Sequence, residues 1–201
     1  MKEFYFSIVI PTYNDSSGFI GSTIETCLSQ YYENYEIIVY QDKIFPSVEK
    51  KINSYSSSRL KFYGGSKRLS ITENWELALD KCKGEYVLFL GHDDGLLFNA
   101  LRDLNIVVNI TKEKLIRYER INFDMVDSSI TEPHIDIPLI RGNYKKSGIR
   151  LIYDIINFKK SYTALPMLYN SIVHRDLLKK LKNLTGRVFA SRNPDVYTGF
   201  A

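Results

Sequence analysis

The sequence contains little cysteine and no long apolar run, which argues against a disulfide-rich protein and against a membrane-spanning one. Its two thiols, Cys27 and Cys82, stand far apart in segments with helical periodicity. That spacing favours reduced core residues over a disulfide or a metal pair. No apolar run approaches the roughly 18–20 residues that cross a bilayer, and the N-terminus MKEFYFSIVIPTYN lacks the apolar h-region of a signal peptide. We therefore expect a cytoplasmic protein.

Several motifs that mark common enzyme classes are also missing. The sequence has no GxGxxG and no GxxxxGK[ST], so it lacks the phosphate loops of dinucleotide-binding proteins and P-loop NTPases. It has no HExxH, CxxC or GxSxG motif either, which leaves zinc hydrolases and serine esterases without support. Any diphosphate that this chain binds must therefore be neutralised by other groups.

The net charge of +4 conceals an asymmetry between the two halves of the 201-residue chain. Residues 1–100 carry 10 Lys and Arg against 13 Asp and Glu, whereas residues 101–201 carry 17 against 10. The basic half is interpreted either as solvated helix faces or as a face that meets an anionic acceptor or headgroups at the inner face of the membrane. No nucleic-acid-binding motif surrounds these residues, so nucleic acid is not expected as a partner.

The first hundred residues alternate between short apolar runs and helical periodicity. The apolar runs predict strands over Ser7–Ile10, Glu36–Tyr40, Leu60–Tyr63 and Tyr86–Leu90. Apolar residues at helical spacing predict helices that include Ile20–Leu28, Val48–Tyr55, Thr72–Cys82 and Leu97–Val108. Four strand–helix units in a row favour an α/β protein, with a mostly parallel sheet covered by helices on both faces, in a single domain of residues 1–201.

The second half of the chain is less regular. Residues Glu119–Ser147 include two prolines and are interpreted as loop and irregular strand. Helices are expected near Gly148–Phe158 and Arg175–Leu184. In the first half, Gly84 is interpreted as the C′ glycine that ends the helix before it.

Polar residues follow the predicted strands, at the edge where parallel sheets bind ligands. Asp93 and Asp94 come directly after the most apolar strand, between Gly91 and Gly95. Two adjacent carboxylates are costly there without a cation, so a hard divalent ion shared with phosphate oxygens explains them. The alternative is an Asp-Asp-Gly turn in which one aspartate caps a helix that starts near Leu96.

Other candidates carry a weaker signal. Asp42 ends the second strand, where it either reaches a base or ribose or is an ordinary loop residue. Lys67 and Arg68 follow the third strand and either reach phosphates or form a surface pair. His92 and His174 are interpreted as structural histidines.

Four segments of the chain together resemble glycosyltransferase family 2: SIVIPTYN (7–14), EIIVYQDK (36–43), ITENWELALDKCKGEYVLFLGHDDG (71–95) and NPDVYTGFA (193–201). They stand in the family's order and at its spacing, and they span essentially the whole chain. The pattern is similar to bacterial members that build cell-surface polysaccharide or lipopolysaccharide. The resemblance implies the GT-A fold, which is Rossmann-like.

This resemblance implies a donor site for a nucleotide-diphosphate sugar, with UDP the expected nucleotide. The turn that holds the base and ribose in the family is matched by Pro11, Thr12, Tyr13 and Asp15. Asp42 matches the acid that hydrogen-bonds a uracil-type base. Residues 1–95 would then form the donor half of the domain and residues 96–201 the acceptor half, which receives a saccharide or a lipid-linked saccharide.

The same resemblance implies how the sugar is transferred. Asp93 would face ribose or phosphate, and Asp94 would hold Mn²⁺ or Mg²⁺. Asp195 matches the general base that deprotonates the acceptor hydroxyl, which gives an inverted anomeric configuration. The alternative role for Asp195 is the N-cap of a helix that begins near Val196, in which case His174 is the next candidate for the base.

Two departures from the family pattern keep other functions open. The turn after the second strand reads QDK instead of DDGS, and the chain stops at Ala201, where we expect a truncated acceptor half. One alternative is a nucleotide-sugar-binding protein that has lost catalysis. Another is a sugar-nucleotide pyrophosphorylase, although that class needs a Gly-rich basic first loop where this chain has PTYNDSSG.

Overall fold

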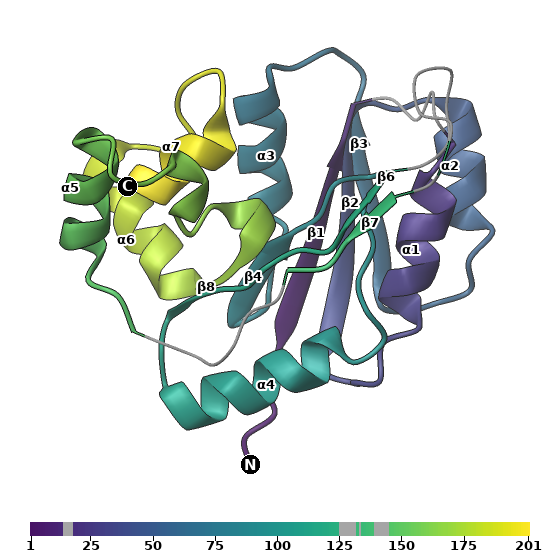
Figure 1. The fold of residues 1–201 in the computed structure, drawn as a ribbon. Helices are drawn as coiled ribbons and strands as arrows, with labels where there is room; N and C mark the ends of the chain where they lie inside the picture. Colours follow the sequence, from purple (N-terminus) through teal and green to yellow (C-terminus); the bar gives the residue numbers. More distant parts are fainter. Residues whose placement is uncertain (14–17, 125–131, 133, 139–144) are drawn as a thin grey trace.

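The computed structural model describes residues 1–13, 18–124, 132, 134–138 and 145–201. Its centre is a six-stranded sheet with the strand order β3-β2-β1-β4-β8-β5. These strands are β1 (Phe6–Thr12), β2 (Tyr35–Lys43), β3 (Leu60–Gly65), β4 (Tyr86–Phe89), β5 (Leu115–Arg117) and β8 (Ser171–His174). Two further strands, β6 (Asn122–Asp124) and β7 (His134–Asp136), form a separate antiparallel pair (Figure 1).

The first four strands run parallel to one another. Strand β1 pairs with β2 and β4, and β2 pairs with β3, all in parallel register. Strand β8 then pairs antiparallel with β4 and with β5. The predicted α/β architecture with a mostly parallel sheet is therefore confirmed, and the carboxyl ends of β1 to β4 meet at one edge.

Strand β1 shows why helices cover both faces of the sheet. Ile8 and Ile10 belong to one core and Val9 to the other, and all three are fully buried. Successive side chains of a strand point to opposite faces, so an entirely apolar strand requires cover on both. The helices on the Ile8 face are α1 (Ile20–Leu28), α2 (Pro46–Asn53) and α4 (Ala100–Thr111); those on the Val9 face are α3 (Ile71–Leu79) and α6 (Arg175–Thr185).

Helix α3 has a capping box at its start and ends earlier than the sequence suggests. The Ser70 hydroxyl accepts from the Glu73 backbone N–H, and the Glu73 carboxylate accepts from the Ser70 backbone N–H. The helix ends at Leu79, so the prediction that Gly84 is its C′ glycine is wrong. Gly84 lies against β1 instead, where an added Cβ would come within 2.5 Å of the Ser7 backbone nitrogen. Gly84 is therefore required by close packing of the backbone.

The second half of the chain is built from short elements. The two predicted helices are confirmed as α5 (Gly148–Ile156) and α6. Between them lie η1 (Tyr162–Ala164), η2 (Leu168–Asn170) and strand β8, and α7 (Pro194–Phe200) follows α6. Figure 1 shows α5, α6 and α7 together on one side of the sheet. Strands β5 and β8 were not predicted. In the described ranges no helix is long and apolar enough to span a bilayer.

Candidate functional site

The carboxyl ends of β1, β2 and β4 open into a pocket of about 370 Å³, called here the donor pocket. It is lined by Pro11, Tyr13, Asp42, Leu69, Ser70, Ile71, Asn74, Trp75, His92 and Tyr169. Its floor is aromatic, because the rings of Trp75 and Tyr169 meet edge to face with 5.0 Å between their centroids. The pocket therefore combines flat apolar surface with a few polar groups, as small-molecule sites commonly do.

One end of the donor pocket holds an interlocked group of Asp42, Arg68 and Tyr13. The Arg68 guanidinium donates to Asp42 Oδ1 at 3.1 Å and to the Tyr13 carbonyl at 2.9 Å, and it lies 3.6 Å from the centroid of the Tyr13 ring. The Leu69 backbone N–H donates to Asp42 Oδ2 at 3.2 Å. Asp42 is 1% exposed, so these donors balance a buried negative charge.

A β-bulge directs Asp42 to this position. The pairing of β2 with β3 shifts its register between Gln41 and Lys43, which leaves Asp42 unpaired in the ladder. Bulges re-aim a side chain in this way. The segment QDK is thus part of strand β2 instead of the turn that the sequence suggested. Gly64 on β3 permits the shift, since a Cβ there would lie 2.6 Å from the Gln41 carbonyl oxygen.

Only some of the other residues predicted to bind the nucleotide lie at the donor pocket. Pro11 lines the donor pocket, and the buried Thr12 lies beneath it, where its carbonyl accepts from the Asn74 side chain at 3.3 Å. Lys67 is exposed and does not line the pocket. Asp15 lies outside the described residues, so the structure says nothing of its role.

Asp93 and Asp94 lie in a tight turn directly after β4. The Gly91 backbone N–H donates to Asp94 Oδ2 at 3.2 Å, and the Asp94 N–H donates to the Gly91 carbonyl at 3.2 Å. Helix α1 holds the turn in place, because the Thr23 hydroxyl donates to the His92 carbonyl at 2.8 Å. Helix α4 begins only at Ala100 after its N-cap residue Asn99, so the alternative that an aspartate of this turn caps that helix is wrong.

Both carboxylates of this turn converge on the space next to Gly91. A Cβ at Gly91 would lie 2.6 Å from Asp94 Oδ2 and 2.9 Å from Asp93 Oδ1. Mg²⁺ is typically bound by one or two carboxylates together with substrate phosphates and water. The described residues contain no cluster of three or more His, Cys, Asp or Glu that would hold an ion alone. The donor set therefore fits an ion shared with a diphosphate and does not form a complete protein cage.

Asp195 lies in the first turn of α7 and bonds across to η2. Its Oδ1 accepts from the Tyr169 backbone N–H at 3.0 Å. The N-cap of α7 is Asn193, whose side chain accepts from the Val196 N–H, so the alternative that Asp195 is the cap is wrong. Burial raises the pKa of Asp195, and the Tyr169 hydrogen bond and the Arg120 charge only partly oppose this. Asp195 thus holds a proton more readily than an exposed aspartate.

Tyr169 joins the donor pocket to the three predicted acidic residues. Burial raises the pKa of its phenol, and the charges of Asp195, Asp94 and Asp93 raise it further, in that order of size. These charges act on one ring only if they lie around it, because such interactions weaken with distance. Asp93, Asp94 and Asp195 therefore lie near Tyr169, which lines the donor pocket, although none of the three lines that pocket itself.

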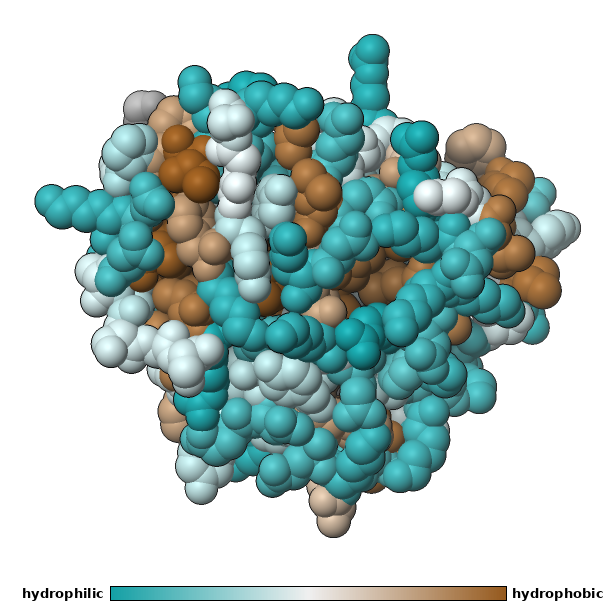
Figure 2. Space-filling view, turned by 180° about the vertical axis from the view of Figure 1, so that it is seen from behind, coloured by the Kyte–Doolittle hydropathy of each residue, from teal (hydrophilic) through white to brown (hydrophobic). Residues whose placement is uncertain are grey.

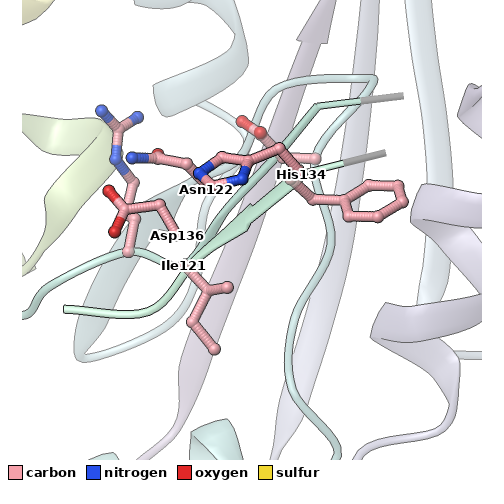
Figure 3. Close-up of a pocket in the computed structure, with 7 residues that line it drawn as sticks. Ile121, Asn122, His134 and Asp136 are labelled. Atoms are coloured by element: carbon pink, nitrogen blue, oxygen red, sulfur yellow. The ribbon is translucent and has the colours of Figure 1, made fainter. Parts of the chain in front are cut away.

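A second pocket of about 450 Å³ lies between Asp94 and the β6–β7 pair, and is called here the hairpin pocket. Its other lining residues are Arg120, Ile121, Asn122, Phe123, His134 and Asp136. Figure 3 shows Asn122, His134 and Asp136 as neighbouring polar side chains on the two paired strands. Sequence reasoning missed all of these residues, because they come together only when β6 and β7 pair.

His174 lies away from both pockets. It pairs with Tyr86 at the start of β4, at the opposite edge of the sheet from Asp94, and its Nδ1 accepts from the Asp176 backbone N–H at 3.2 Å as the N-cap of α6. The expectation that His174 is structural fits this position. His92, also expected to be structural, lines the donor pocket.

The chain was compared with known families and structures. Residues 7–181 match the model of the family described as Glycosyl transferase family 2. The chain belongs to this family. WfgD of Escherichia coli, a UDP-Glc:alpha-D-GlcNAc-diphosphoundecaprenol beta-1,3-glucosyltransferase, is 29% identical over 101 residues, which are 50% of this chain and 40% of WfgD. This chain spans less than half the length of such curated relatives.

Two solved structures show the same fold. TarS of S. aureus in complex with UDP-GlcNAc is 20% identical, with a TM-score of 0.66 over 97% of this chain and 52% of that one. The mannosyltransferase PcManGT from Pyrobaculum calidifontis, in complex with GDP-Man and Mn²⁺, is 15% identical, with a TM-score of 0.60 over 98% of this chain and 51% of that one. The predicted GT-A fold is confirmed by these likenesses.

Proposed function

We propose that this glycosyltransferase family 2 chain transfers a sugar from a UDP-linked donor to a hydroxyl of a saccharide or lipid-linked saccharide. The observation that carries the proposal is that Asp93, Asp94 and Asp195 all lie near Tyr169, which lines the donor pocket together with Asp42 and Tyr13, the two residues that Arg68 contacts. The names of WfgD and of the TarS complex, both with UDP-sugars, support the choice of nucleotide.

The base and ribose bind at the end of the donor pocket formed by Tyr13, Arg68 and Asp42. Arg68 is held in stacking contact with the Tyr13 ring by its bond to Asp42, and a flat base binds on such a pair by stacking against its free face. The diphosphate then extends toward Asp93 and Asp94. A Mn²⁺ or Mg²⁺ ion held by Asp94, with Asp93 beside it, would supply the positive charge that the leaving diphosphate needs.

Asp195 acts as the general base on the acceptor. Its pKa is raised by burial, so its carboxylate is a stronger base than that of an exposed aspartate. Its carboxylate takes the proton of the acceptor hydroxyl while the oxygen attacks the anomeric carbon and the bond from that carbon to the diphosphate oxygen breaks. Attack from the side opposite the leaving group inverts the anomeric configuration.

A thermal-shift screen tests the donor assignment. UDP-, dTDP-, GDP- and CMP-linked sugars are added with Mn²⁺ or with EDTA, and binding to the native state raises the melting temperature. At about one hundred times the Kd the stabilisation is about 2.7 kcal/mol. We expect the largest shift with a UDP-sugar and Mn²⁺. Absence of a shift with every nucleotide sugar would contradict the proposal, and equal shifts with Mn²⁺ and EDTA would contradict the role of Asp94.

Catalysis requires a second readout, because a nucleotide-sugar-binding protein that has lost catalysis would pass the first. Release of free nucleoside diphosphate from the donor that gives the largest shift is measured with a lipid-linked saccharide as acceptor. A control variant, Asp176→Asn, changes an exposed carboxylate at the start of α6, away from the donor pocket. We expect turnover in the wild type and in this control.

A further inference from the structure

Helix α5 exposes an unusual amount of apolar side chain. Ile149 is 84% exposed, Ile156 66% and Phe158, directly after the helix, 97%. With Tyr153, which is also exposed, these residues form what is called here the α5 surface. Single exposed apolar residues are common, but four of them within ten residues form a patch of the kind that marks an interaction site.

The α5 surface exists because the helix is apolar on more than its inner face. Leu151 and Ile155 turn inward and pack in a small core with Leu165 and Met167. Ile149, Tyr153 and Ile156 repeat at i, i+4 and i+7, which places them along one outward stripe of the same helix. The apolar stripe is thus not needed for the packing of α5 onto the protein.

Cations surround this stripe. Residues 145–162 carry five Lys and Arg against the single acidic residue Asp154. The Lys159 ammonium lies 5.6 Å from the centroid of the Tyr153 ring, and Lys160 pairs with Asp154 at 2.8 Å. Phe158 adopts a left-handed backbone conformation with φ of 55° and is almost fully exposed at the turn immediately before the two lysines.

The α5 surface lies close to the candidate catalytic base. The small core beneath α5 includes Val196, the residue after Asp195. Figure 1 shows α5 beside α7 at one end of the molecule. In Figure 2, which is turned by 180°, apolar side chains gather at the corresponding right-hand edge, mixed with hydrophilic ones.

We propose that the α5 surface docks the protein on a membrane with anionic headgroups, with Ile149, Ile156 and Phe158 inserted among the lipids. This rests on the proposed function, in that a lipid-linked acceptor presents its saccharide at such a membrane. Apolar residues flanked by Lys and Arg are typical of helices that lie in the bilayer interface, and anionic lipids attract cations close to the surface. Protein interfaces are instead depleted in Lys.

Sedimentation with vesicles tests the docking without any sugar nucleotide. Wild-type protein is mixed with vesicles of phosphatidylcholine and phosphatidylglycerol, or of phosphatidylcholine alone. We expect binding to the anionic vesicles and much weaker binding to the neutral ones. The triple variant Ile149→Ser/Ile156→Ser/Phe158→Ser should weaken the anionic binding by at least about tenfold, since the inserted apolar area is lost. Lys159→Gln/Lys160→Gln should weaken it by about thirtyfold, from about fivefold per cation.

Two control variants match these changes away from α5. Ile110→Ser/Leu184→Ser removes apolar side chains that are 74% and 73% exposed on α4 and α6. Lys50→Gln/Lys51→Gln removes two exposed cations on α2, at the far side of the sheet in Figure 1. Both should bind anionic vesicles as the wild type does. Circular dichroism melting checks that every variant is folded, which we expect because the substituted residues are exposed.

The outcomes separate this proposal from the proposed function. Failure to bind anionic vesicles, or equal loss in the α5 variants and their controls, would overturn the docking even if sugar transfer proceeds. Self-association in ultracentrifugation that Phe158→Ser abolishes, without vesicle binding, would assign the surface to a second copy of the chain instead. Vesicle binding in a protein that transfers no sugar would leave the docking intact and overturn only the function.

Discussion

The two sides of the candidate site are built in different ways. On the donor side, Asp42 lies on a nine-residue strand in the middle of a parallel sheet and is 1% exposed. On the acceptor side, Asp195 lies on a seven-residue helix and accepts a backbone hydrogen bond from Tyr169 in η2. In the proposed function, nucleotide binding thus depends on the core of the fold, whereas proton transfer depends on short elements attached to it.

Helix α3 attaches the segment before Asp195 to the rest of the fold. Glu76 on α3 accepts from the backbone N–H groups of Val188 and Phe189, the latter at 2.7 Å. Tyr169 and Phe189 both pack edge to face on Trp75 of the same helix. Helix α3 is therefore the common support of the donor pocket and of the segment that leads to Asp195.

The largest expected effect comes from removing the candidate base. Asp195→Asn keeps the shape and an oxygen that accepts the Tyr169 hydrogen bond, but it cannot take a proton. The rate of sugar transfer should fall about 10²–10⁴-fold, as measured by release of nucleoside diphosphate. Transfer at the wild-type rate would contradict the role of Asp195. Asp176→Asn serves as the control.

The raised pKa of Asp195 adds a signature in pH. The acidic limb of the pH profile of kcat/KM should lie at a higher pH than an ordinary aspartate, whose pKa is about 3.9, would give. The effect of this group on stability is opposite to that of a carboxyl whose pKa is lowered by folding. The folded state favours the protonated form of Asp195, so the free energy of unfolding falls as the pH rises from the pKa of Asp195 in the unfolded state to its higher pKa in the folded state. Asp195→Asn should lack this fall in melting temperature, and an unchanged fall would contradict the raised pKa.

The next largest effect is expected at the metal ligand. Mn²⁺ should increase the affinity for UDP in the wild type. In Asp94→Asn this increase should be smaller by a factor of about ten or more, as is common for altered metal sites. Calorimetric titration of UDP with Mn²⁺ and with EDTA measures this gain. Asp103→Asn, an exposed carboxylate on α4, is the control. A gain that persists in full in Asp94→Asn would place the ion elsewhere.

A smaller effect is expected on the nucleotide side. Arg68→Ala removes the group stacked on Tyr13, and among the described residues it leaves the Leu69 N–H as the hydrogen-bond donor to Asp42. UDP affinity should fall about tenfold, since one hydrogen bond to a charged group is lost, while the Mn²⁺ requirement stays. Arg68→Lys keeps the charge without the planar stack and should restore part of the affinity. Equal affinity in all three proteins would exclude Arg68 from the site.

The smallest expected effect concerns the attachment of the acceptor side. Glu76→Gln replaces a charged acceptor of two backbone N–H groups with a neutral one. Unfolding free energy should fall by about 1 kcal/mol, as measured by urea denaturation, with UDP affinity unchanged. Glu49→Gln, an exposed residue on α2, is the control. A loss of UDP affinity in Glu76→Gln would show that the two sides are coupled.

The donor side was largely predictable from the sequence, because its pattern is local. Apolar runs such as Ser7–Ile10 and Tyr86–Leu90 mark buried parallel strands, and polar residues such as Asp94 follow them directly. Two features needed the structure. The bulge at Asp42 depends on the pairing of β2 with β3, and the contact of Arg68 with Asp42 joins residues 26 positions apart.

The acceptor side was less predictable because its contacts are distant in sequence. Strand β8 has four residues, and it pairs with β4, more than eighty positions earlier. So short a strand gives too little alternation to be recognised. Asp195 was predicted from the family resemblance and not from periodicity. No pattern in the sequence around it predicts its hydrogen bond with Tyr169. The hairpin pocket likewise forms only by strand pairing.

The most direct test of the division between the two sides is the affinity for UDP in the presence of Mn²⁺, measured by calorimetry for the wild type, Arg68→Ala and Asp195→Asn. The account predicts wild-type affinity for Asp195→Asn and about tenfold weaker binding for Arg68→Ala. If Asp195→Asn weakens UDP binding as much as Arg68→Ala does, nucleotide binding and proton transfer are not carried by separate parts of this fold.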